Sequence, residues 1–147
     1  MIRKLTHVAA LFLIFASARV QARAWQGVTA GVSSKQDVVS KFGSPHKVIQ
    51  KSGRCAVLLN YQKDRKIRGT SQTNFCFDAQ GKLLQIAVFP DTSITRKLVE
   101  EAYGSEYKKK LTDQFREYYL YKKDGMAVFW SKDGKLVDSI LFTPTKK

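Results

Sequence analysis

The sequence is poor in the side chains that most often carry catalysis or hold metal ions. It has only two histidines and two cysteines in 147 residues. One histidine lies in the N-terminal stretch that we expect to be removed, which leaves His46 and two sulfur atoms, too few ligands for a zinc site. The sequence has no Gly-x-Ser-x-Gly motif and no glycine-rich phosphate loop. These absences argue against an enzyme, and we expect no metal and no cofactor.

Long hydrophobic runs are also missing. The longest uncharged apolar run, residues 8–16, is well short of the ~20 residues that span a bilayer as a helix. It follows two basic residues and precedes small-residue patterns that end at Ala22 and Ala24, which is the order of a secretory signal peptide. We expect residues 1–22 to be a signal peptide cleaved near Ala22 or Ala24; the alternative is an uncleaved anchor. No cysteine follows the run, so we do not expect a lipoprotein.

Acidic residues are few compared with basic ones. The sequence has 26 Lys and Arg and 12 Asp and Glu, a formal net charge of +14. Three basic and no acidic residues would leave with the signal peptide, which lowers the charge to +11. Such a charge favours encounters with an acidic protein, anionic lipid or an envelope polyanion. Nucleic acid does not suit an exported protein, and the alternative is a basic surface that only keeps the protein soluble.

The two cysteines are a candidate disulfide. Cys55 and Cys76 lie in strand-like runs separated by one turn, and an even number of cysteines in an exported chain favours a bridge. Sequence does not fix the register that would bring their Cα atoms within about 7 Å. Two buried free thiols therefore stay as the alternative.

What the sequence does contain is a pattern that occurs twice in the same order. Gly43-Ser44 and Gly104-Ser105 each end an apolar helical pattern, and Gly81-Lys82-Leu83 and Gly134-Lys135-Leu136 each begin a final strand. Internal repetition of this kind determines architecture. The sequence therefore predicts an α+β fold of two tandem helix-plus-antiparallel-sheet repeats, the first over 23–90 and the second over 91–147.

Local signals place the elements inside each repeat. Ser34 with Asp37 resembles a capping box at the start of the first helix, and Gly43 is a typical helix stop. The second helix should end at Gly104. Strands are expected at 47–50, 55–61, 73–78 and 83–89 in the first repeat, and at 114–122, 126–131 and 135–142 in the second.

Side-chain alternation assigns the hairpin residues to faces of the sheets. The helix-covered face should carry Phe75, Phe77, Leu84, Ile86 and Val88 in the first repeat and Val128, Trp130, Val137 and Leu141 in the second. Ala127, Phe129, Ile140 and Phe142 should face away. Because both faces then carry aromatic residues, the two outer faces either pack together or form an exposed concave surface for a partner.

Two short motifs resemble a known family. The stretch from Gly31 to Pro45, which includes Ser34 and Gly43, and the later Phe77-Asp78-x-x-Gly81-Lys82 are similar to the SmpA/OmlA (BamE-like) envelope family. Tandem copies of this fold are also the plan of β-lactamase-inhibitor proteins. The resemblance implies a non-enzymatic protein that acts in outer-membrane assembly or as an inhibitor, and it does not specify the partner.

Two groups of residues are candidates for partner binding. Tyr119, Tyr121 and Phe129 are aromatic residues of the kind that dominate interface hot spots, although they could equally form the core of the second repeat. Two basic clusters could steer an acidic partner, although either could be a solvated turn: Arg65, Lys66 and Arg68, and Lys108, Lys109 and Lys110.

Together these observations predict an exported binding module in the periplasm or outside the cell, with an envelope protein as its partner. The second hypothesis is a binder of anionic lipid or envelope polyanion through the basic surface. The third, an enzyme, would depend on His46 as its base.

Overall fold

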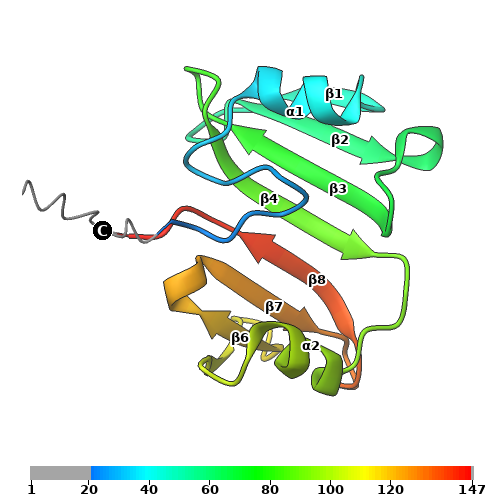
Figure 1. The fold of residues 1–147 in the computed structure, drawn as a ribbon, viewed down its shortest axis with the longest axis vertical. Coiled ribbons are helices and arrows are strands. Elements are labelled where there is room, and N and C mark those ends of the chain that lie inside the picture. Colours follow the sequence, from blue (N-terminus) through cyan, green and yellow to red (C-terminus); the bar gives the residue numbers. More distant parts are fainter. Residues whose placement is uncertain (1–20, 147) are drawn as a thin grey trace, which may run out of the picture.

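An eight-stranded antiparallel sheet runs through the whole of the described chain (Figure 1). This computed structural model describes residues 21–146. The strand order is β1-β2-β3-β4-β8-β7-β6-β5. The strands are β1 (Lys47–Gln50), β2 (Val57–Gln62), β3 (Thr70–Phe77), β4 (Leu83–Pro90), β5 (Lys108–Leu111), β6 (Glu117–Tyr121), β7 (Met126–Trp130) and β8 (Val137–Phe142).

The expected fold of two tandem helix-plus-sheet repeats is wrong. β4 pairs with β8 through Ile86–Phe142, Ala87–Leu141 and Val88–Ile140, so the strands of both halves belong to one sheet. β4 is the last strand of the first half and β8 is the last strand of the second. Without their pairing, each would be an edge strand with unpaired backbone N–H and C=O groups. The fold is dominated by this sheet, and the two outer faces expected from sequence are one continuous face.

Two short helices, α1 (Lys35–Phe42) and α2 (Arg96–Tyr103), lie on the same face of the sheet (Figure 1). The expected capping box at α1 is present, because the Ser34 hydroxyl accepts from the Asp37 amide and the Asp37 carboxylate accepts from the Ser34 amide. Helices of eight residues are not stable alone. They depend on packing, and each buries one valine completely against the sheet.

The core lies between the helices and the sheet face that they cover. Its largest buried side chains come from the central strands: Phe75, Phe77, Leu83, Ile86, Tyr121, Met126, Trp130 and Phe142. Two buried tyrosines also connect the sheet to the helix ends. The Tyr61 hydroxyl donates to the Gly43 carbonyl at 2.8 Å, and the Tyr121 hydroxyl donates to the Gly104 carbonyl at 2.9 Å. These bonds satisfy carbonyls that a helix terminus leaves without a partner.

The segment 22–34 has no helix and fills the space between α1 and α2 (Figure 1). Its backbone bonds to the start of β4, from the Gly31 amide to the Leu83 carbonyl and from the Leu83 amide to the Ser33 carbonyl. At its beginning, the Arg23 amide donates to the Asp124 carbonyl at 2.8 Å. The segment therefore contacts both halves of the sheet and forms part of the helix-side layer.

Two β-bulges decide which hairpin residues face the helices. In the β3–β4 hairpin, Phe77 pairs with Leu83 and Cys76 with Gln85, so Leu84 is an extra residue. A bulge shifts the alternation of side chains by one position. Leu83 is therefore buried in the core, and the assignment of Leu84 to the helix-covered face is wrong.

The β7–β8 hairpin has the same feature at Asp138, because Trp130 pairs with Val137 and Phe129 with Ser139. The predicted faces beyond this bulge are reversed. Ile140 and Phe142 face the helices and are buried, whereas Leu141 lies on the opposite face. Ala127, Phe129, Val128 and Trp130, on the strand without the bulge, lie on the faces predicted for them.

The predicted elements differ from the structure most in the second half. The strand expected at 114–122 begins at Glu117, and a further edge strand, β5, occupies Lys108–Leu111. β5 consists mostly of lysines, so it has no apolar alternation that would identify it as a strand. The three lysines treated as a loop-like basic cluster are thus the outermost strand of the sheet.

The expected disulfide is confirmed. Cys55 and Cys76 are bonded, with their Cα atoms 5.5 Å apart. The bond joins the segment before β2 to β3. The predicted signal peptide lies almost entirely outside the described residues, and within 21–146 no helix is long and apolar enough to cross a membrane.

Candidate functional site

Within residues 21–146, no helix packs on the face of the sheet opposite α1 and α2, and we call this the open face. Strand register places its residues in rows across the sheet. The central row runs from one edge strand to the other as Lys47, Asn60, Asn74, Ala87, Leu141, Ala127, Leu120 and Lys108. A neighbouring row contains Ser139, Phe129, Tyr118 and Lys110. The central row has a lysine at each end and no charge between them, and in the neighbouring row only Lys110 is charged.

One half of the open face is apolar. Over β6, β7 and β8 it consists of Tyr118, Leu120, Ala127, Phe129 and Leu141. The Tyr118 and Phe129 rings stack with their centroids 4.9 Å apart. An antiparallel sheet that faces water usually presents polar side chains there. An apolar patch in this position is typical of a surface that binds a partner.

The other half of the open face carries side-chain amides. The Asn60 amide donates to the Asn74 side-chain oxygen at 2.7 Å, and the Gln72 amide donates to the same oxygen at 3.2 Å. The Asn60 side-chain oxygen is buried and has no hydrogen-bond partner among residues 21–146. Gln72 and Asn74 are only half-buried, so this half can exchange hydrogen bonds with a bound molecule without a net charge.

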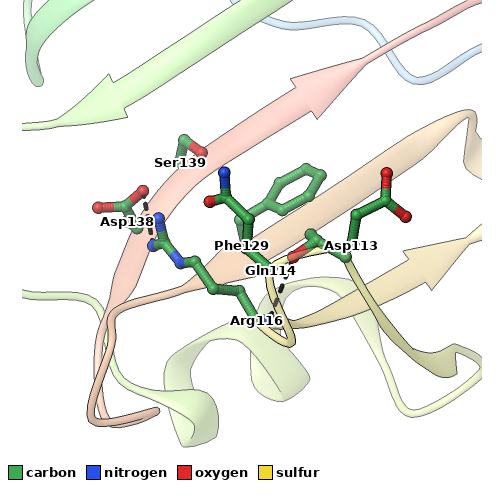
Figure 2. A pocket seen from close by; sticks show the side chains of 7 residues that line it. Asp113, Gln114, Arg116, Phe129, Asp138 and Ser139 are labelled. Atoms are coloured by element: carbon green, nitrogen blue, oxygen red, sulfur yellow. Dashed lines mark hydrogen bonds and ion pairs between the residues drawn. The ribbon is translucent and has the colours of Figure 1, made fainter.

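A hollow of about 310 Å³ lies beside Phe129 on the open face (Figure 2). Arg116 and Asp138 close one side of it through an ion pair of 3.1 Å, and Arg116 also donates to the Trp130 carbonyl at 2.9 Å. Asp138 is the extra residue of the β7–β8 bulge. The bulge thus places a carboxylate at the border of the apolar half.

The hairpin loop between β5 and β6 projects beside this hollow. It is internally bonded, since the Thr112 carbonyl accepts from the Phe115 amide and the Thr112 hydroxyl accepts from the Arg116 amide. Phe115 has a φ of 59° and its side chain is 85% exposed. A left-handed backbone costs a residue other than glycine about 1 kcal/mol. A strained and exposed phenylalanine is therefore unfavourable for the isolated protein, which makes it a candidate contact.

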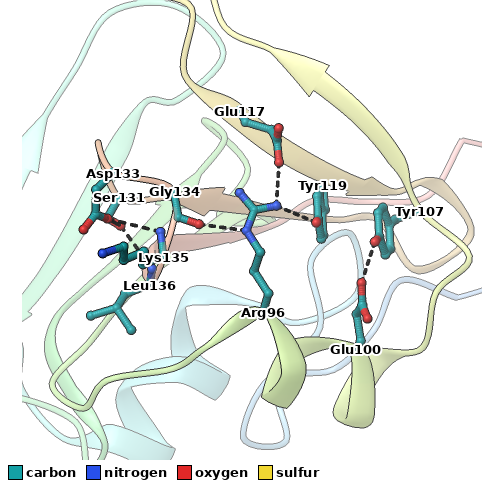
Figure 3. A network of polar contacts seen from close by, with 10 residues as sticks. All are labelled: Arg96, Glu100, Tyr107, Glu117, Tyr119, Ser131, Asp133, Gly134, Lys135 and Leu136. Carbon is teal, nitrogen blue, oxygen red and sulfur yellow. Dashed lines mark hydrogen bonds and ion pairs between the residues drawn. The ribbon is translucent and has the colours of Figure 1, made fainter.

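A polar network on the helix side holds this part of the sheet in place (Figure 3). Arg96, the first residue of α2, donates to the Gly134 carbonyl at 2.7 Å, to Glu117 at 2.6 Å and to the Tyr119 hydroxyl at 2.5 Å. Its guanidinium also lies 4.5 Å from the centre of the Trp130 ring. Burial alone would lower the pKa of Arg96, but the hydrogen bonds to Glu117 and Tyr119 raise it. Arg96 therefore stays charged and connects α2 to β6 and to the β7–β8 turn.

The structure separates the three aromatic residues proposed for partner binding. Tyr119 and Tyr121 face the helices and are 2% and 1% exposed. They belong to the core, so they do not offer a surface to a partner. Phe129 lies on the open face, together with Tyr118. Strict alternation along β6 would have identified Tyr118, because Tyr119 and Tyr121 share the opposite face.

The two predicted basic clusters lie at different places on the sheet. Arg65, Lys66 and Arg68 are exposed in the connection between β2 and β3, and Lys66 forms an ion pair with Asp91 at 3.4 Å. Lys108, Lys109 and Lys110 form the edge strand β5, with four strands between it and β3. The clusters therefore cannot act as one patch.

His46 lies at the end of the sheet, with its Nδ1 atom 3.7 Å from the Asp64 carboxylate. Its backbone amide donates to the Asn60 carbonyl at 2.8 Å. Within residues 21–146, no three His, Cys, Asp or Glu side chains are grouped so that they could hold a metal ion.

Comparison with known proteins identifies a similar fold only. No family model and no curated protein matches the sequence. The structure is similar to the crystal structure of a DUF4309 family protein (YjgB) from Bacillus subtilis, with a TM-score of 0.55 and 17% sequence identity. The match covers 80% of this chain and 83% of that chain. It does not bear on the resemblance to the SmpA/OmlA family.

Proposed function

We propose that this chain is an exported, non-catalytic binding protein that captures a protein partner on the open face. The proposal is carried by the uncharged centre of that face. Interfaces have charge-depleted, aromatic-rich centres and charged rims, and the open face has this composition. Tyr118, Phe129 and Leu141 supply the apolar centre, and lysines stand at both edges of the sheet.

The rim specifies the kind of partner. Lys47 and Lys108 are separated by seven strand spacings, which is roughly 30 Å. A complementary protein would have an apolar patch flanked by acidic residues. A second copy of this chain is disfavoured, since its lysine rims would meet lysines of the first copy.

The sheet also suits this role mechanically. The apolar half is carried by β6, β7 and β8, and the backbone of each of these strands is hydrogen-bonded to a neighbouring strand on both sides. A rigid surface loses little conformational entropy when it binds. The resemblance to the SmpA/OmlA family, which implies envelope scaffolding, and the predicted signal peptide agree with a partner in the cell envelope.

The test is affinity capture from envelope extract, followed by a binding measurement with the isolated partner. Leu141→Lys places a charge in the centre of the open face and should weaken binding at least tenfold. Leu98→Lys is the matched control, because Leu98 is 49% exposed on α2, on the other side of the sheet. Equal affinity of the Leu141→Lys variant and the unaltered protein would refute the proposal.

A second candidate function is binding of anionic lipid or an envelope polyanion. The specific observation in its favour is the strand β5, in which three adjacent lysines are exposed. Binding of this kind should weaken strongly as salt concentration rises. Salt-insensitive association would exclude it.

A further inference from the structure

We propose that the corner of the sheet formed by β5 and the β5–β6 loop docks on an anionic lipid surface, with Phe115 inserted among the headgroups. The inference rests on the second candidate function, binding of anionic lipid; it shares Lys108 and Lys110 with the rim of the open face but uses none of the apolar centre that carries protein capture. It rests on three observations about one hairpin: unpaired lysines, exposed apolar side chains and a stiff loop.

No acidic side chain within residues 21–146 pairs with the lysines of β5. In the part of the chain that the structure describes, none of the ion pairs involves Lys108, Lys109 or Lys110. Lys109 lies over the Tyr119 ring at 5.9 Å, which leaves its charge in place. Lysines are common on edge strands because they prevent sheets from adding to one another. That role explains the lysines but does not explain the apolar residues that follow them.

Two apolar side chains, one at the end of β5 and one in the loop that follows it, are exposed. Leu111 is 61% exposed and Phe115 is 85% exposed. The two hydrogen bonds between Thr112 and the residues at 115 and 116 fix the loop in the shape that presents Phe115. Since the loop is ordered before binding, insertion of the ring loses little conformational entropy.

A membrane fits this corner better than a protein does. A stable protein interface buries about 800 Å² on each partner, and a hairpin tip with two apolar side chains does not provide this area. A lipid interface needs no matching pocket, and aromatic rings are favourable at the level of the headgroups. Lysines close to an anionic surface each strengthen binding by about fivefold. Docking through the edge would leave the open face accessible to a partner.

The test uses the full mature chain and two kinds of vesicle, phosphatidylcholine alone and phosphatidylcholine mixed with phosphatidylglycerol. The variant Lys108→Gln, Lys109→Gln, Lys110→Gln should bind the mixed vesicles roughly a hundredfold more weakly. The matched control removes three positive charges elsewhere, by Lys63→Gln, Arg65→Gln, Arg68→Gln. It should lose less than about fivefold. Equal losses in the two variants would show that net charge alone drives binding, and would overturn the proposal.

The role of Phe115 is tested separately. Phe115→Asn keeps a residue that tolerates the left-handed backbone and should weaken vesicle binding roughly tenfold. Val48→Asn, on the opposite edge strand, is the control and should have no effect, since Val48 is exposed there. After subtraction of the emission of the unaltered protein, which comes from Trp25 and Trp130, Phe115→Trp should give an emission that shifts to shorter wavelength when mixed vesicles are added.

Three outcomes would overturn the inference. They are an unshifted tryptophan emission, no difference between the two kinds of vesicle, and a Phe115→Asn variant that loses protein capture but keeps vesicle binding. The last result would assign the tip to a protein interface. The Leu141→Lys variant separates the two proposals, because it should lose the protein partner and keep its affinity for vesicles.

Discussion

Replacement of Arg96 should destabilise the protein more than its partly exposed position suggests. The side chain is 34% exposed, but it bonds to Glu117, Tyr119 and the Gly134 carbonyl and stacks on Trp130. Hydrogen bonds to charged groups contribute about 1.5–3 kcal/mol each, and a cation–π contact about 0.5–1 kcal/mol at an exposed site. The low ends of these ranges come to about 5 kcal/mol for the three hydrogen bonds and the cation–π contact. Because solvent screens part of the interaction, Arg96→Ala should lower the free energy of unfolding by less than this, about 3 kcal/mol.

The measurement is urea unfolding of the purified protein, followed by circular dichroism. Lys97→Ala is the matched control on the same helix, since Lys97 is 85% exposed and lies 3.8 Å from Glu101. It should change stability by less than about 0.5 kcal/mol. Arg96→Lys should fall between the two, because an ammonium cannot reproduce the planar arrangement of donors. If Arg96→Ala is no less stable than Lys97→Ala, the network in Figure 3 does not anchor α2.

Two further predictions concern backbone geometry and alkaline pH. Gly125→Ala should destabilise the protein by more than about 3 kcal/mol, because the added Cβ would lie 2.2 Å from the Thr143 carbonyl oxygen. Gly53 also has a positive φ but open space around it, so the control Gly53→Ala should cost about 1 kcal/mol. Equal thermal midpoints of the two variants would contradict this prediction. Burial raises the pKa of Tyr121 to about 12. Because the unfolded tyrosine ionises near pH 10 and the folded one does not, the stability present below pH 10 should decline as pH rises toward 12. Urea unfolding across this range should show a shallower decline for Tyr121→Phe, and an equal slope would refute the assignment.

The sequence was informative where local chemistry determines structure. The capping box of Ser34 and the glycine at the end of α1 were predicted because caps depend on residues a few positions apart. The disulfide between Cys55 and Cys76 was predicted from their number and their strand-like surroundings. For these features the residues that decide the structure are also neighbours in the sequence or are chemically distinctive.

The sequence was misleading where strands meet over long distances. The pairing of β4 with β8 joins residues more than fifty positions apart, and no local signal indicates it. The bulges at Leu84 and Asp138 reverse the faces of the residues beyond them, so alternation placed Ile140 and Phe142 on the wrong face. A bulge depends on how two strands fit a curved sheet, which is a property of the assembled fold.

The candidate site was predicted only in part, for related reasons. Phe129 was identified, but Tyr118 was missed because aromatic residues crowd β6 on both faces. The three lysines at 108–110 were found as a cluster, although their place at the sheet edge depends on the long-range strand order. Phe115 is not among the sequence candidates, because its left-handed backbone and its exposure are properties of the folded loop.

The position of segment 22–34 has a consequence for the order of events when the chain is made. Its amides and carbonyls meet partners at Leu83 and Asp124, residues that leave the ribosome or a translocation pore long after it does. Segment 22–34 therefore emerges before the residues it bonds to, and it can take up its final position only after they have emerged. Until most of the polypeptide has followed, the helix-side layer lacks this segment, and the apolar side chains against which Val28 packs remain accessible to chaperones.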